Sequence, residues 1–260
     1  MKPEKVKKVH LVIIAALLVI CSSTTRDQKA LLKKVDALAS YMNSDFSAKY
    51  TFIQVKPGEG SKKTVAAVFR RDSKDIYTIL ILEPSTSKGQ GYLKQRDTLW
   101  FYDPDGRVFN STSSKERFQN SNARNSDFTR STLAEDYDVA AQSSGKLGQY
   151  RCTILELKAN NDEVTYPFMK IWISDDNLVR KTEDYSLSGQ LLRTTLIPKY
   201  QKAGNRDIPY QILMVDHLLG ANVNGKFENE KTQITIESVS FEPIPDRVFS
   251  KSFLESKSID

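Results

Sequence analysis

Cysteine and histidine are scarce in this sequence, with two residues of each type among 260. Two cysteines are too few for a disulfide framework or a four-cysteine zinc site. The 11 glycines and 9 prolines are too few for a collagenous or low-complexity chain. Because 39% of the residues are hydrophobic and 27% are charged, we expect a folded chain that buries a core.

A single long hydrophobic run lies near the start of the chain. Leu11–Ile20 is an unbroken stretch of ten apolar residues that follows a lysine-rich segment. It is shorter than the roughly 20 residues that span a membrane, but it has the length of the apolar part of a signal peptide. We predict that residues 1–20 are a signal peptide, residues 21–26 a tether and residues 27–260 a single domain.

Cys21 directly follows that apolar run and is itself followed by serines and threonines. This arrangement resembles a bacterial lipoprotein signal, which implies that Leu18–Cys21 acts as a lipobox and that Cys21 is diacylated. Ile20 is bulkier than the residue usual before the cysteine, a departure that spirochaete lipoproteins tolerate. We expect a lipid anchor at Cys21, with an uncleaved anchor or plain secretion as the alternatives.

Positive charge is not concentrated in the remainder of the chain. Four of the 38 Lys and Arg residues and one of the 32 Asp and Glu residues lie in residues 1–20, so the rest has a net charge of only +3. No basic stripe of the kind that neutralises nucleic-acid phosphates is left, and we expect no nucleic-acid partner.

The mature chain opens with one helical pattern. Leu31, Val35, Leu38 and Met42 recur at steps of four, three and four residues, which predicts a helix over Arg26–Met42 with one apolar face. We expect this face to cover part of a sheet.

From Asp45 onward the apolar period changes to two, with turn signals such as Asp103–Gly106 between the runs. The pattern predicts a mainly β protein with about twelve strands in one large curled antiparallel sheet, an incomplete barrel. The predicted strands are Phe46–Lys56, Thr64–Arg71, Asp75–Glu83, Gly89–Gln95, Thr98–Tyr102, Arg107–Ser111, Tyr150–Ala159, Phe168–Ser174, Val179–Leu187, Gln190–Tyr200, Tyr210–Leu218 and Lys231–Phe241.

One predicted strand is apolar on both faces. Ile76–Leu82 lacks the polar alternation of a sheet that is wet on one side, so both of its faces must be covered. The N-terminal helix can cover one of them. A curled sheet with large apolar side chains on its concave face either fills itself or leaves an apolar cavity, and the residues alone leave both outcomes open.

The stretch Ser113–Asp138 is polar and rich in asparagine, with a short helix expected near Ser131. Ordered excursions of this length are often lids or binding elements. We assign Asp127, Asp136 and Tyr137 to such a lid, in which the two carboxylates act as a latch or, alternatively, as helix caps and turn acceptors.

Four short segments, Gly91–Lys94, Leu99–Pro104, Ser126–Phe128 and Glu135–Tyr137, resemble in order and spacing those of the LolA-like outer-membrane lipoprotein-sorting family. The likeness extends from about Leu31 to the end of the chain. It implies an incomplete barrel of about eleven antiparallel strands, closed by an N-terminal helix and a helical lid, around an apolar cavity for the acyl chains of a lipid or lipoprotein. The resemblance also implies that the protein is located in the cell envelope.

Large apolar side chains are the expected lining of such a cavity, although core packing is the alternative for each of them. An acyl chain favours them because burial of each CH₂ contributes about 0.8 kcal/mol. The expected lining residues are Ile79, Ile81, Trp100, Tyr102, Phe128, Met169 and Trp172.

The sequence contains no nucleophile elbow, zincin motif or P-loop. Asp216 and His217 form the one acid–histidine neighbour pair and are the catalytic candidates, with a structural role as the alternative. Asp103 and Asp105 are candidates for a Ca²⁺ site, although a plain hairpin turn explains them as well. We otherwise expect no metal and no cofactor.

Together these features predict a monomeric, non-enzymatic lipoprotein that binds acyl chains and acts in lipid or lipoprotein transport. We expect it to be anchored through Cys21 on the periplasmic side of the inner or outer membrane. The alternative is a phospholipase-like lipid hydrolase that uses the same cavity. A carrier returns its lipid intact, whereas a hydrolase returns lysolipid and fatty acid.

Overall fold

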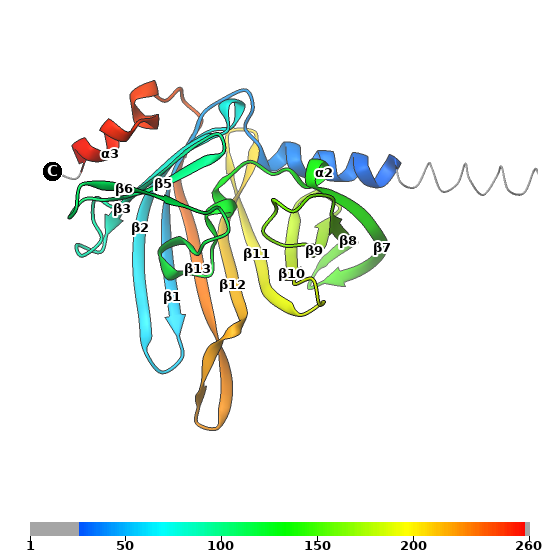
Figure 1. Cartoon of the computed structure of the whole chain (residues 1–260). Helices are drawn as coiled ribbons and strands as arrows, with labels where there is room; N and C mark the ends of the chain where they lie inside the picture. The colour runs from blue at the N-terminus through cyan, green and yellow to red at the C-terminus, as the bar shows by residue number, and fades with distance from the viewer. Residues whose placement is uncertain (1–25, 258–260) are drawn as a thin grey trace, which may run out of the picture.

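The computed structural model describes residues 26–257, and a single 13-stranded sheet runs through them (Figure 1). The strand order is β6-β5-β4-β3-β2-β1-β13-β12-β11-β10-β9-β8-β7, and all neighbours pair antiparallel. The first and last strands therefore meet in the middle, while β6 and β7 form the two edges.

Two runs of strands build this sheet. The first consists of β1 (Phe46–Lys56), β2 (Gly60–Arg71), β3 (Ile76–Glu83), β4 (Gly91–Gln95), β5 (Thr98–Asp103) and β6 (Val108–Thr112). The second consists of β7 (Tyr137–Leu147), β8 (Tyr150–Ala159), β9 (Phe168–Ser174), β10 (Val179–Tyr185), β11 (Leu191–Ala203), β12 (Arg206–Val223) and β13 (Lys226–Ser240).

The helices are short apart from the N-terminal one, which covers residues 26–39. The others are the 3₁₀ turns η1 (Asp72–Lys74), η2 (Phe118–Asn120), η3 (Asn125–Phe128) and η4 (Asp246–Phe249), and the helices α2 (Leu133–Asp136) and α3 (Lys251–Lys257). Figure 1 shows the segment between β6 and β7, in green, lying across the curled sheet. We call residues 113–136 the lid segment.

The prediction of a mainly β chain with a curled, open antiparallel sheet is confirmed, and each predicted strand is present within a few residues of its expected bounds. The additional strand is β7, which the sequence did not indicate. Most of its residues are exposed because it is an edge strand, so it lacks the alternation that reveals a half-buried strand.

Both faces of β3 are covered, as its composition predicts. On the concave side Ile79 and Ile81 are fully buried in a cluster that includes Phe118 and Phe128 of the lid segment. On the convex side Leu80 packs in a cluster with Leu254 of α3.

The expectation that the N-terminal helix covers β3 is therefore wrong, because these two other segments occupy its faces. Helix α3 reaches the sheet closely at Gly91 of β4. A Cβ atom on Gly91 would lie 2.5 Å from Cδ2 of Leu254, so the close approach depends on glycine at this position.

The N-terminal helix instead packs near the β7–β9 end of the sheet. Leu32 and Val35 are buried there with Leu155, Ile171 and residues of α2. The helix ends at residue 39, before the predicted end at Met42, and Leu38 is left 37% exposed beside an open cavity. Within residues 26–257, no helix combines the length and apolar character needed to cross a membrane.

Leu32 has no exposed surface, so its truncation tests how much the N-terminal helix contributes to the fold. We expect Leu32→Ala to lower the free energy of unfolding by about 2–5 kcal/mol, because it removes buried methyl groups and leaves a cavity. Urea unfolding checks this value. The exposed Lys34→Ala on the same helix should change it by less than about 0.5 kcal/mol, and equal effects of the two substitutions would show that the helix is not docked as described.

Candidate functional site

A cavity of about 570 Å³ lies between the concave face of the sheet, the N-terminal helix and the lid segment. Its size is within the range of about 300–1,000 Å³ usual for small-molecule sites. Much of its wall is aliphatic or aromatic, which suits an apolar ligand. Lining residues of this kind include Val35, Leu38, Tyr50, Phe128, Met169, Ile212, Met214 and Ile234.

A row of charged residues crosses this concave face. Arg193 of β11 lies directly opposite Asp184 of β10 on one side and Asp216 of β12 on the other. All three are buried. We call these three residues the charged row. Buried charges are costly unless they are paired, so the row requires partners from the surrounding segments.

Arg193 is the centre of the charged row and lies on the cavity wall. Its Nε donates to Asp184 Oδ2 at 2.7 Å, while Nη1 and Nη2 donate to the two carboxylate oxygens of Asp127 at 2.6 and 3.1 Å. The guanidinium also lies over the ring of Tyr166, 4.9 Å from its centroid. A residue of the lid segment is thus held against the sheet by a bidentate ion pair.

The charges around Arg193 shift its titration. Burial lowers the pKa of Arg193, but the carboxylates of Asp127 and Asp184 outweigh this effect and hold the pKa well above its ordinary value. Burial raises the pKa of Asp184, and the guanidinium of Arg193 opposes that rise. Arg193 therefore stays cationic on the cavity wall, which also includes the charged residues Arg70, Lys94, Arg130, Asp136, Glu163 and Asp207.

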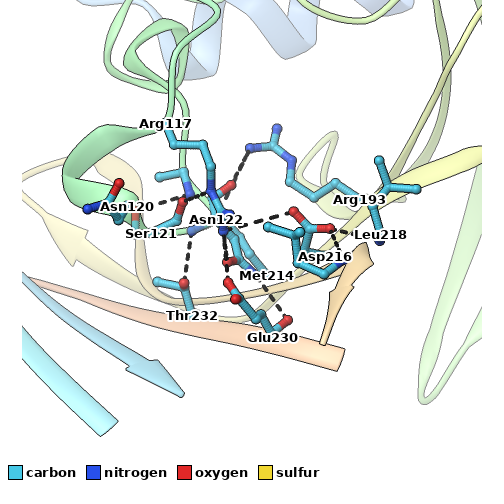
Figure 2. Close-up of polar contacts among 12 residues, drawn as sticks. Arg117, Asn120, Ser121, Asn122, Arg193, Met214, Asp216, Leu218, Glu230 and Thr232 are labelled. Atoms are coloured by element: carbon cyan, nitrogen blue, oxygen red, sulfur yellow. Dashed lines mark hydrogen bonds and ion pairs between the residues drawn. The ribbon is translucent and has the colours of Figure 1, made fainter. Parts of the chain in front are cut away.

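A second polar cluster attaches the lid segment to β12 and β13, as Figure 2 shows. Arg117 Nη2 donates to Asn122 Oδ1 at 2.7 Å and to Glu230 Oε2 at 3.1 Å, and lies 3.9 Å from Asp216 Oδ2. The backbone N–H of Asn122 donates to Thr232 Oγ1 at 3.0 Å. Arg117 of the lid segment thus neutralises Glu230 of the sheet, and Arg193 of the sheet neutralises Asp127 of the lid segment.

The far end of the lid segment is attached to the N-terminal helix. Asp36 Oδ1 accepts hydrogen bonds from Ser131 Oγ and from the N–H of Leu133, and Oδ2 accepts one from the N–H of Ala134. A carboxylate from another helix therefore satisfies the free N–H groups at the start of α2. The helix and the lid segment form one continuous cover over the cavity.

Solved structures with this architecture come from several bacteria. A LolA superfamily protein from Nitrosomonas europaea has a TM-score of 0.71 at 22% identity, over 86% of this chain and 97% of that one. A DUF1329 family protein from Desulfovibrio piger has a TM-score of 0.77 at 18% identity, over 88% and 98%. A putative outer membrane lipoprotein-sorting protein domain from Vibrio parahaemolyticus has a TM-score of 0.74 at 17% identity, over 87% and 97%.

A family model described as "uncharacterized protein" matches residues 73–256, which is more than half of the chain. The chain belongs to this family of uncharacterized proteins, and its fold is that of the LolA-like structures. No curated protein sequence matches it significantly. The resemblance inferred from the four short sequence segments is thus confirmed, and the low identities to the solved structures establish the fold rather than a ligand.

Two of the residues expected to line the LolA-like cavity, Phe128 and Met169, lie on its wall. Ile79 and Ile81 are on the same concave side but are fully buried beneath the lid segment, where Phe118 packs in the same cluster.

The other three expected lining residues face away from the cavity. Trp100 and Tyr102 belong to the convex cluster that α3 covers. Trp172 lies three residues from Met169 on β9 and therefore points to the opposite face, where Lys181 lies over its ring. An apolar side chain on a sheet of this kind can be buried on either face, which is why composition did not separate them.

The three residues assigned to the lid have different partners. Asp127 binds Arg193 and also accepts a hydrogen bond from the N–H of Arg124 at 2.7 Å. Asp136 accepts from Thr132 Oγ1 at 2.5 Å, a local side-chain contact across α2 that caps neither end of the helix. Tyr137 Oη donates to the carbonyl of Tyr166 at 2.9 Å.

Asp216 and His217 are neighbours in a strand and do not act on one another. Asp216 Oδ1 accepts from the N–H groups of Leu218 and Leu219, whereas His217 Nε2 contacts Thr194 Oγ1 at 2.9 Å. Within residues 26–257, no three His, Cys, Asp or Glu side chains come close enough together to hold a metal ion. Asp103 accepts a hydrogen bond from the N–H of Asp105 in the β5–β6 turn.

Sequence patterns did not indicate the charged residues that attach the lid to the sheet, Arg117, Arg193 and Glu230, or Asp184, which holds Arg193 in place. For Arg193 the available signal was a charged residue in phase with the apolar residues Leu191 and Ile197 of β11. Asp184 had no such signal, because the apolar residues of β10 are out of phase with it. The ion pairs between the lid and the sheet could not be predicted from the sequence, because the two partners of each pair are distant along the chain.

Asp36 provides a direct test of the connection between the helix and the lid segment. We expect Asp36→Ala to lower the free energy of unfolding by about 1 kcal/mol, as the loss of a helix cap does, and to speed hydrogen exchange at the amides of Leu133 and Ala134. The exposed Asp27→Ala on the same helix serves as the control. Unchanged exchange at these two amides in Asp36→Ala would contradict the capping role.

Proposed function

We propose that this LolA-like protein binds the acyl chains of a lipid or lipoprotein in the cavity beneath the lid segment. The observation that carries the proposal is a 570 Å³ cavity with a largely apolar wall, covered by a lid that polar contacts attach to the sheet. Polar attachment matters because such contacts can be exchanged for water when the lid opens, whereas a packed apolar core has no such alternative partner.

The fold supports a transport role by analogy. The similar domain from Vibrio parahaemolyticus is described as a putative outer membrane lipoprotein-sorting protein. For this chain the comparable role is to accept, hold or pass on acyl chains in the cell envelope, and the analogy of fold is the warrant for it.

Anchoring at the membrane is the second part of the proposal. Cys21 lies outside the described residues, and the lipid anchor rests on the signal-like run that precedes it. A protein tethered on the periplasmic side of the inner or outer membrane cannot travel between the two. It therefore acts as an acceptor or a holding site rather than a diffusing carrier.

The bound molecule is the first thing to determine. We expect organic extracts of the purified protein to contain intact lipid or acylated peptide when analysed by mass spectrometry. Lysolipid and free fatty acid in place of intact lipid would instead favour the hydrolase, and an empty extract after exposure to phospholipid vesicles would contradict binding.

A matched pair of substitutions locates the bound lipid. Ile212 lines the cavity on β12, whereas its neighbour Leu213 points to the convex face. We expect Ile212→Trp to reduce the extracted lipid severalfold because the indole fills part of the cavity, and Leu213→Trp to retain the parental amount. Equal lipid content in the two variants would place the ligand elsewhere.

The anchor is tested separately. We expect Cys21→Ala to shift the protein from the detergent phase to the aqueous phase in a phase-partition experiment, because it removes the only acceptor for the diacyl group. A Cys152→Ala variant, which changes the buried free thiol, should partition like the parent. Retention of Cys21→Ala in the detergent phase would show that lipidation at this cysteine is not the anchor.

A further inference from the structure

We propose that Arg193 is the head-group site of the cavity, where it binds a carboxylate or phosphate at the end of an acyl chain in place of the carboxylate of Asp127. This inference rests on the proposed function and adds the chemical class of the ligand, an anionic amphiphile. It follows from three features of Arg193: which edge of its guanidinium is available, what holds that edge in place, and the charges around it.

The edge of Arg193 that faces the lid is the one that binds oxyanions. Nη1 and Nη2 donate in parallel to the two oxygens of Asp127 at 2.6 and 3.1 Å. This fork geometry matches a carboxylate or a phosphate from any source, because both present two oxygens at the required spacing. The Asp127 carboxylate thus occupies the position that the head group of a ligand would take.

Arg193 is held in place by the sheet and not by the lid alone. Its Nε is bound to Asp184 Oδ2 at 2.7 Å, and its guanidinium lies over the ring of Tyr166. Asp127, by contrast, belongs to the lid segment, and 26% of its side chain is exposed. Movement of the lid would therefore remove Asp127 and leave the cationic fork in position.

The surrounding charge makes Asp127 and an anionic ligand mutually exclusive. The carboxylates of Asp127, Asp184 and Asp216 all lie near or opposite Arg193. Asp184 is fully buried and its Oδ1 has no hydrogen-bond partner among the described residues, while Arg117 lies 3.9 Å from Asp216 and offsets that carboxylate. A ligand anion added to this set would be repelled, whereas one that replaces Asp127 keeps the charge balance.

The cavity also has room for the acyl chain of such a ligand. Arg193 shares the cavity with Met214, Ile212 and Met169, so a head group at Arg193 leaves the attached chain against apolar side chains. Exchange of Asp127 for the ligand also breaks the ion pair that holds this part of the lid. Binding of the head group thus removes one of the contacts that hold the lid.

The test compares three probes with the same chain, namely palmitate, hexadecyl phosphate and 1-hexadecanol, by equilibrium binding of radiolabelled ligand to the purified protein. We expect the parent to prefer the two anions. Asp127→Asn should tighten anion binding by about tenfold, the size of one charge-assisted contact, because the competing carboxylate is gone. Binding of the alcohol should not tighten. Asp105→Asn, in the exposed β5–β6 turn, is the matched control and should bind as the parent does.

A second variant removes the fork together with Asp184, the fully buried carboxylate that pairs with it. Arg193→Met combined with Asp184→Leu replaces the ion pair with apolar side chains, an exchange that folded proteins often accept. This variant should bind the alcohol and lose the preference for anions.

Each outcome of these binding experiments either supports or contradicts the assignment of Arg193 as the head-group site. A response by palmitate alone or by hexadecyl phosphate alone would support the inference and identify the head group as carboxylate or phosphate. Equal effects of Asp127→Asn on all three ligands, or an anion preference that survives in the double variant, would overturn the inference while leaving acyl binding intact. Failure of all three ligands to bind the parent would overturn the proposed function itself.

Discussion

The structure depends on the neutralisation of one buried cation. Arg193 of β11 is buried at the cavity wall, where an unpaired guanidinium would be very costly. Asp184 from the neighbouring strand and Asp127 from the lid segment supply the compensating charge. Because only the second of these partners comes from outside the sheet, the electrostatic requirement of a sheet residue determines where the lid sits.

The same requirement explains why the lid is attached by polar groups. Asp127 meets Arg193, Arg117 meets Glu230, and Asp36 caps α2. Between these attachments the lid contributes Phe118 and Phe128 to an apolar cluster. The apolar contacts give the closed form its stability, and the polar contacts give it a defined register that a competing polar group can disrupt.

Much of the fold was predictable from local patterns. Period-two alternation located every strand except β7, and the two-faced apolar composition of β3 correctly indicated cover on both sides. Edge strand β7 was not predictable, since an exposed strand is not required to alternate. The cavity lining was predicted only in part, with Phe128 and Met169 on the wall and Trp172 on the opposite face.

The lid shows the limit of sequence reasoning most clearly. The polar composition of residues 113–136 and the position of Asp127 suggested a latch, but nothing in the sequence identified its partner. Arg193 lies 66 residues from Asp127, and the two meet only because the sheet curls. From the sequence alone, an arginine in a strand is expected to be exposed to solvent. Only the fold shows that the face of the sheet on which it lies is covered.

The sequence by itself determined the elements, since local alternation and turn chemistry decide where strands form and end. It also indicated the LolA-like fold, through short segments whose order is a property of the chain. Only the tertiary structure decided which apolar residues enclose the cavity and which carboxylates neutralise Arg193. The physical reason is that burial and charge compensation are properties of surfaces brought together from distant parts of the chain, and a linear pattern does not contain those distances.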